Sequence, residues 1–154
     1  MYPTGDSFTN GGSQRVLAKS PRPRAFRRAL IMRGVGTDIV EIARLARSLR
    51  RQPAFATTVF SAEERRFCDA QARPDQHYAA RFAAKEAFLK AVNRGVLDGV
   101  ALDEIEIARS PADAPTFRLG PSAAAALAAV GGREALVSLS HDGGMALAFV
   151  VVWG

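Results

Sequence analysis

Two acidic residues, Asp38 and Glu86, lie where a carboxylate could hold a metal ion. Asp38 follows the glycine-punctuated segment Gly34–Thr37, and Glu86 lies at the edge of an apolar stripe on a predicted helix. A carboxylate in such a place is costly to bury unless a cation meets it. Two carboxylates brought together suit Mg2+, which accepts one or two of them and completes its octahedron with water and phosphate oxygens. Asp38 and Glu86 are therefore candidate magnesium ligands.

Both residues also have simpler explanations that involve no metal. Glu86 and Lys90 are spaced i, i+4, so they can form an ion pair on the surface of their own helix. Asp38 precedes a predicted helix, and an aspartate at such a junction often caps the helix N-terminus. The residues alone leave these alternatives open.

A histidine is the third candidate. His141 ends the segment Ser138–His141, which closes an apolar strand beside a glycine turn. Strand ends often present ligand-binding groups, and an imidazole with nearby hydroxyls can donate hydrogen bonds to a phosphate. A histidine that only satisfies the turn is an equally good interpretation. His77 precedes a long predicted helix among polar residues, and we assign it no role.

The elements that would position Asp38 are a strand and an amphipathic helix. The segment 33–37 is short and contains two glycines, which predicts a strand that ends at Asp38. Apolar residues at helical spacing then predict a helix over 42–51. Three arginines line another face of this helix: Arg44, Arg47 and Arg51. That basic stripe is either a docking face for a partner or a solvated surface.

Glu86 belongs to a long predicted helix. Residues 77–93 contain neither glycine nor proline and Gly95 follows, so we expect one continuous helix there. Pro74 is expected to break the chain before it. Further upstream, Ser61 and Glu64 form a capping-box pattern that predicts a shorter helix.

The C-terminal half has the pattern of antiparallel strands with one short helix. Strands are expected at 105–107 and 116–119, which can pair across a turn. An alanine-rich helix is expected over 121–130, followed by a hairpin of 135–140 with 145–153. The elements lack a regular βαβ rhythm. They predict an α+β fold, with an antiparallel sheet, a long central helix and additional packed helices.

The size and composition indicate one folded domain. The chain has 154 residues, of which 48% are hydrophobic and 23% are charged, values typical of a globular protein. Cys68 is the only cysteine, so no internal disulfide can form and a reducing, cytoplasmic compartment is expected. No apolar run approaches the roughly 20 residues that span a bilayer, so no membrane association is expected.

Most of the net charge of +6 comes from the first 31 residues. Six basic residues and one acid give this segment a net charge of +5. Its glycines, prolines and small polar residues show no sustained period, which predicts a disordered basic leader at 1–31 before a folded domain at 32–154. The alternative is a nucleic-acid-binding module. No stacking or groove motif accompanies the charge, so no nucleic-acid partner is expected.

Five sequence blocks are similar to those of one enzyme family. They are Gly34–Ile42, Phe60–Glu64, Arg81–Ala91, Asp103–Ile107 and Val137–His141. In this order and spacing they resemble the holo-acyl carrier protein synthase branch of the phosphopantetheinyl transferases. These Mg2+-dependent enzymes move the 4'-phosphopantetheine arm of coenzyme A onto a serine of an acyl carrier protein and release 3',5'-ADP. The resemblance extends from about Met32 to the C-terminus and implies the same activity and fold; the leader departs from the family pattern.

The resemblance also implies roles for single residues. Asp38 and Glu86 would hold the Mg2+ that touches the coenzyme A pyrophosphate, and Lys90 would neutralise phosphate charge beside them. These three residues form the expected catalytic set. Further contacts to coenzyme A would come from three residues: Lys85, Ser140 and His141.

The last implications concern macromolecular partners. Acyl carrier proteins are strongly acidic, and Arg44 and Arg51 coincide with family positions that meet the carrier. Arg47 joins them because it lies on the same helix face. Standalone family members of this size are typically homotrimers with active sites between subunits, so Asp38 and His141 of one site are expected to come from different chains. The sequence does not choose between a carrier of fatty acid biosynthesis and one of polyketide synthesis.

Overall fold

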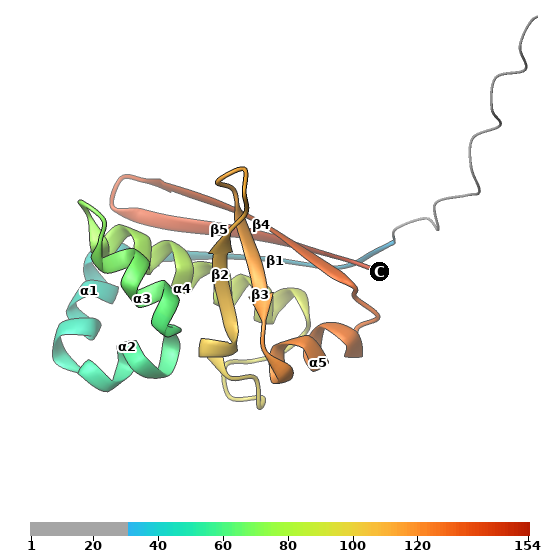
Figure 1. Ribbon diagram of the computed structural model, residues 1–154. Helices are drawn as coiled ribbons and strands as arrows, with labels where there is room; N and C mark the ends of the chain where they lie inside the picture. Colours follow the sequence, from blue (N-terminus) through green and yellow to red (C-terminus); the bar gives the residue numbers. More distant parts are fainter. Residues whose placement is uncertain (1–30) are drawn as a thin grey trace, which may run out of the picture.

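One long helix, α4 (Pro74–Ala91), lies against a three-stranded antiparallel sheet and organises the fold (Figure 1). The computed structural model describes residues 31–154. The predicted leader therefore lies outside the described residues except for Ile31, whose backbone exchanges two hydrogen bonds with Gly154. Among the described helices, none is both long and apolar enough to cross a membrane.

The sheet has the strand order β1–β5–β4, and both neighbouring pairs are antiparallel. Its strands are β1 (Met32–Glu41), β4 (Glu134–Asp142) and β5 (Met145–Trp153). In the register, Asp38 lies opposite Ala148, and Ala148 lies opposite Leu139. The predicted end of β1 at Asp38 was wrong, because pairing with β5 continues to Glu41. Asp38 therefore lies inside a strand and does not cap the following helix.

Small residues bring β1 and α4 into close contact. A Cβ atom at Gly36 would overlap the carbonyl oxygen of Ala87, and one at Gly34 would overlap that of Ala91. On β5, the side chains that face α4 are buried and small or β-branched: Ala146, Ala148, Val150 and Val152. Close packing of this kind fixes the strand against the helix backbone.

Three short helices cover one end of α4: α1 (Ile42–Arg51), α2 (Pro53–Val59) and α3 (Ala62–Asp69) (Figure 1). The predicted helix over 42–51 is confirmed. The capping box is also confirmed, since Ser61 and Glu64 exchange both of its hydrogen bonds. The sequence reasoning missed α2. Pro74 does not break the chain but occupies the first turn of α4, where its missing N–H costs nothing.

The remaining elements form a small second sheet and a last helix. A 3-10 turn (Leu102–Glu104) leads into β2 (Ile105–Arg109), which pairs antiparallel with β3 (Pro115–Leu119). Helix α5 (Pro121–Ala129) then leads to the β4–β5 hairpin. This arrangement confirms the predicted α+β class with antiparallel strands and a long central helix.

Candidate active site

Asp38, Glu86 and Lys90 meet where β1 crosses α4. The Lys90 ammonium donates to Asp38 Oδ1 at 2.8 Å and to the Thr37 carbonyl at 2.9 Å. Burial and the negative charge of Asp38 raise the pKa of Glu86 above its ordinary value, while Lys90 acts in the opposite direction. The alternative of an ion pair between Glu86 and Lys90 within α4 is not realised, because Lys90 pairs with Asp38 on β1. The structure thus brings the three predicted catalytic residues together.

The donor set at this cluster fits Mg2+. One ammonium, which pairs with Asp38, lies near both carboxylates, and burial followed by the negative charge of Asp38 raises the pKa of Glu86. Within residues 31–154, no group of three or more histidine, cysteine, aspartate and glutamate side chains gathers at one point. A metal at Asp38 and Glu86 would therefore take the rest of its shell from water and substrate oxygens, as Mg2+ does at phosphate sites.

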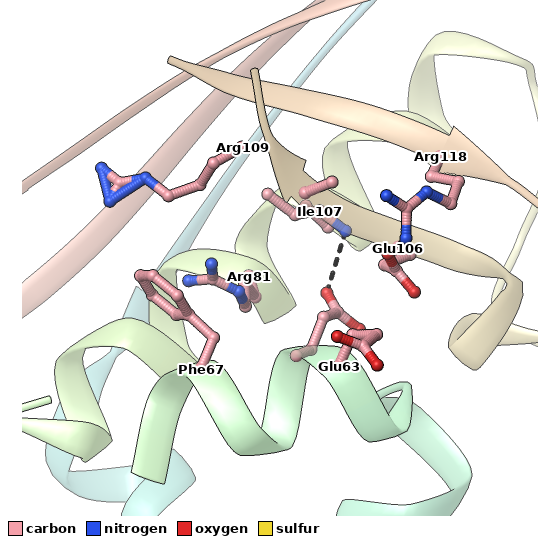
Figure 2. Close-up of a pocket in the computed structure, with 9 residues that line it drawn as sticks. Glu63, Phe67, Arg81, Glu106, Ile107, Arg109 and Arg118 are labelled. Carbon is pink, nitrogen blue, oxygen red and sulfur yellow. Dashed lines mark hydrogen bonds and ion pairs between the residues drawn. The ribbon is translucent and has the colours of Figure 1, made fainter. Parts of the chain in front are cut away.

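A second polar cluster lies on the opposite flank of α4. Five residues, which we call the cationic pocket, line a cavity of about 240 Å3: Phe67, His77, Arg81, Arg109 and His141. A neighbouring cavity of about 220 Å3 shares Phe67, Arg81 and Arg109 and continues beneath the β2–β3 hairpin (Figure 2). Arg81 and Glu86 are five positions apart on the helix, about 140° around its axis. The two clusters therefore face different directions.

Arg81 is the most unusual member of the cationic pocket. It is 5% exposed, burial lowers its pKa, and its Nε finds no hydrogen-bond partner among the described residues. Its guanidinium carbon lies 4.1 Å from the Phe67 ring centroid, and that of Arg109 lies 5.3 Å from the same ring (Figure 2). A guanidinium whose Nε–H is unpaired beside a cavity is suited to bind a phosphate or carboxylate.

Two histidines complete this pocket. The His77 ring meets the edge of Phe67 at a centroid distance of 5.7 Å. Burial lowers the pKa of His77, and the positive charges of Arg81, Arg109 and His141 lower it further. The sequence reasoning gave His77 and Arg81 no role. The signal was present in the spacing, since positions 77 and 81 lie one turn apart on one face of α4.

Two predicted contacts to coenzyme A lie away from this pocket. Lys85 has no solvent exposure, and its ammonium is bound to Glu64, 2.7 Å away. Ser140 precedes His141 on β4, and neighbouring strand residues point to opposite faces of a sheet. The geometry within one chain therefore gives no support to the predicted role of either residue, whereas His141 does line the cavity.

Arg44, Arg47 and Arg51, the three α1 arginines predicted to form the basic stripe, are all exposed. Arg44 also borders a small cavity of about 170 Å3 together with Val40 and Phe82. Val40 is close in sequence to Asp38, and Phe82 is close in sequence to Glu86. Arg47 lies 3.7 Å from Glu41. The basic face thus begins near β1 and α4, the two elements that carry the carboxylate cluster.

Comparison with known proteins agrees with these features. The model of the 4'-phosphopantetheinyl transferase superfamily matches residues 34–150. The holo-[acyl-carrier-protein] synthase of Clavibacter sepedonicus is 40% identical over 124 residues, which cover 80% of this chain and 98% of that protein.

Solved structures extend the similarity to the fold. The holo-[acyl-carrier-protein] synthase of Neisseria meningitidis superposes with a TM-score of 0.72 at 35% identity, covering 79% of this chain and 98% of the other. The Helicobacter pylori enzyme of the same name, in complex with coenzyme A, gives a TM-score of 0.66 at 32% identity, with 77% and 98% covered. With most of its described residues matched in sequence and in structure, this chain belongs to the 4'-phosphopantetheinyl transferase superfamily.

Proposed function

We propose that this chain is a holo-acyl carrier protein synthase. It transfers 4'-phosphopantetheine from coenzyme A to a serine of an apo-acyl carrier protein and yields the holo-carrier and 3',5'-ADP. The observation that carries the proposal is the Asp38, Glu86 and Lys90 cluster in a chain of this superfamily. The coenzyme A complex of the Helicobacter pylori relative supports the choice of donor.

Asp38 and Glu86 would hold Mg2+, which when bound stabilises charge on the phosphoryl oxygens. Lys90 is half-exposed, so its ammonium can exchange a contact with Asp38 for one with a phosphate oxygen. The serine oxygen forms a bond to the β-phosphorus while the bond from that phosphorus to the leaving 3',5'-ADP breaks. The serine proton passes to a base at the site, either the Glu86 carboxylate or a water molecule beside it. Fixed positive charges that stabilise the negative charge developing on the phosphoryl oxygens supply most of the catalysis in phosphoryl transfer.

The cationic pocket suits the nucleotide end of coenzyme A, which carries the 3'-phosphate and the pyrophosphate. Arg81 offers its Nε–H, which the described residues leave unpaired, Arg109 adds positive charge from β2, and His141 adds an imidazole from β4. The Phe67 ring provides an apolar wall between the arginines and α3. This assignment replaces Lys85 as the expected phosphate ligand.

Assembly into a homotrimer is part of the proposal. The sheet face turned away from α4 exposes five large apolar side chains: Val35, Ile39, Leu136, Leu147 and Phe149. Such contiguous apolar surface is rare on a monomer and is typical of an interface. The cavity that His141 lines does not include Asp38, Glu86 or Lys90, so a neighbouring subunit would have to complete each site.

The exposed face of Arg44, Arg47 and Arg51 would receive the acidic carrier, because it begins near β1 and α4, which carry the carboxylates where the serine must arrive. A cytoplasmic location, expected from the single cysteine, would give access to both substrates.

Mass spectrometry of a purified apo-carrier tests the proposal. Incubation with the protein, coenzyme A and Mg2+ should add the mass of phosphopantetheine, and omission of Mg2+ should prevent the gain. A carrier whose serine is replaced by alanine is the matched control. Persistent failure to modify several apo-carriers under these conditions would refute the proposed reaction.

A further inference from the structure

A buried ion pair joins the elements that enclose the cationic pocket. The ammonium of Lys85, on α4, lies 2.7 Å from Glu64 Oε2, on α3, and neither side chain has any solvent exposure. Burying two charges costs free energy that only close pairing and complete hydrogen bonding can offset. The partners of each charge show what the pair connects.

The ammonium of Lys85 has three acceptors, so all of its donors are used. Besides Glu64, it donates to the carbonyl oxygens of Leu102 at 2.9 Å and of Ile105 at 2.7 Å. These two carbonyls lie where the 3-10 turn enters β2. Lys85 thus attaches the start of the β2–β3 hairpin to the middle of α4.

The Glu64 carboxylate makes the matching connections from α3. Its Oε2 accepts the backbone N–H of Ser61 at 3.0 Å, which completes the helix cap. Its Oε1 accepts the backbone N–H of Ile107 at 3.1 Å, the dashed contact in Figure 2. The pair therefore holds α3, α4 and β2 to one another through a single buried network.

Each of these elements supplies one wall of the cationic pocket. Phe67 comes from α3, Arg81 from α4 and Arg109 from β2. Lys85 follows Arg81 by one helical turn. A shift of β2 against α4 would therefore change the separation of the two guanidinium groups.

We propose that the Glu64–Lys85 pair positions the residues of the cationic pocket. The pair thereby sets the affinity of the pocket for coenzyme A without contacting coenzyme A itself. The inference rests on the proposed function, because it takes coenzyme A as the ligand of this pocket. Removing one partner leaves the other charge buried and unpaired and releases β2 from α4. Arg81 and Arg109 then lose the spacing that meets the phosphates.

The test compares Lys85→Met, Glu64→Gln and the double variant. Calorimetric titration measures the affinity for coenzyme A and for 3',5'-ADP, and steady-state kinetics measures kcat and KM for both substrates. Each single variant should bind both nucleotides about tenfold more weakly, as is usual when a supporting partner of a binding group is lost. The double variant should lose little more, because both changes break the same network.

Two further readouts separate positioning from general damage. The kcat at saturating coenzyme A and the KM for the carrier should stay within about twofold of the wild type. Arg66→Met is the matched control, because it removes an exposed basic residue from the same helix as Glu64. Its nucleotide affinity should equal that of the wild type.

A direct contact between Lys85 and a phosphate predicts a different result. Lys85→Met would still weaken binding, but Glu64→Gln would remove a negative charge near a polyanion and so strengthen it. That outcome, or unchanged affinity in both variants of an active enzyme, overturns the inference alone. A wild type that binds no coenzyme A would end both the inference and the proposed function.

A second variant keeps the test decisive if Glu64→Gln does not fold. The combination Glu64→Leu with Lys85→Met removes both charges together, a change that buried pairs commonly tolerate. It also removes the bonds to Leu102, Ile105 and Ile107. We expect the same tenfold loss of nucleotide affinity, and wild-type affinity in this variant would overturn the inference.

Discussion

Asp38, Glu86 and Lys90 form an unbalanced set of charges, because two carboxylates lie near one ammonium that pairs with Asp38. Burial, and then the negative charge of Asp38, raise the pKa of Glu86, and Lys90, which pairs with Asp38, acts in the opposite direction. A divalent cation would relieve the excess negative charge. The apo-protein therefore carries a local destabilisation that belongs to its binding site.

This imbalance predicts how Glu86 affects stability as a function of pH. In the folded protein the pKa of Glu86 is raised above its ordinary value of 4.5. The stability that Glu86 contributes is therefore fully present below pH 4.5 and is lost as pH rises through the raised pKa. Without Mg2+, Glu86→Gln should therefore gain stability relative to the wild type between pH 5 and 8. Thermal unfolding across this range measures the difference, with the exposed Glu134→Gln as control. If Glu86→Gln instead lost stability relative to the wild type as pH rises, the raised pKa of Glu86 would be contradicted.

The sequence could predict the carboxylate cluster but not the place of Lys85. Asp38, Glu86 and Lys90 follow motifs whose order and spacing are specific, and their meeting needs only that β1 packs on α4. The burial of Lys85 depends on Glu64, 21 residues away, and on carbonyls of a turn that no periodicity reveals. Motif resemblance therefore assigned a phosphate contact to a side chain whose charge is already paired.

At the scale of elements, the contact between β1 and α4 decides whether the carboxylates meet. Gly36 lies two residues before Asp38, and any Cβ atom there would overlap the backbone carbonyl of Ala87, next to Glu86. Backbone cannot move aside as a flexible side chain can. The glycine thus sets the distance between the two candidate metal ligands.

We expect Gly36→Ala to lower the free energy of unfolding by about 1–3 kcal/mol and to reduce transfer strongly, because overpacking would push Asp38 away from Glu86. Denaturant unfolding and a transfer assay measure the two effects. Gly95→Ala is the control, since its nearest neighbour is only the flexible side chain of Asp98. Normal activity of Gly36→Ala would show that the strand can shift without harm to the site.

The arginine face of α1 is expected to affect the use of the acidic carrier but not the use of coenzyme A. Joint reversal of Arg44 and Arg51 to glutamate should raise the KM for the acidic carrier, with a loss that shrinks as salt rises, because encounter with a charged partner is screened. The KM for coenzyme A should barely change. Saturation curves for both substrates at two ionic strengths measure this, with exposed Arg66 and Arg133 reversed as a charge-matched control. An equal loss toward both substrates would place the arginines inside the active site.

Elements with strong local signals were predicted well, and those defined by their neighbours were not. The α1 periodicity, the Ser61 capping box and the β4–β5 hairpin each carry their own signal and are confirmed. The full length of β1 depends on pairing with β5, which the sequence of β1 does not contain. Pro74 was misinterpreted because a proline disrupts a helix interior but suits a first turn.

For the whole molecule, the first question is what the N-terminal segment contributes. We expect a protein that starts at Met32 to keep its transfer activity and assembly, because the matched family region begins at residue 34. The change also removes two backbone hydrogen bonds between Ile31 and Gly154, a small loss at a chain end. Transfer assays and light scattering compare both lengths, and an inactive or insoluble shorter protein would show that the boundary is wrong. Salt-sensitive nucleic-acid binding by the longer protein alone would support the alternative role.

The last question is whether one chain can form a complete site. Within one chain, Asp38 and Glu86 face one flank of α4, while Arg81 and His141 line a cavity on the other. If neighbouring subunits join these halves, a chain defective in one half can still supply the other. Subunit exchange between two inactive variants therefore tests the shared site directly.

We expect Asp38→Ala and His141→Ala each to be inactive or nearly so alone, and a mixture that has exchanged subunits to regain transfer. With random association, about one quarter of the sites would combine an intact carboxylate half with an intact cationic half. The double variant mixed with either single variant is the control, because no site in that mixture has both halves intact. The activity recovered after denaturation and joint refolding, compared with that of separately refolded samples, measures the effect. Absence of recovery, with assembly confirmed by light scattering, would mean that each chain builds its own site and that the apolar sheet face serves assembly alone.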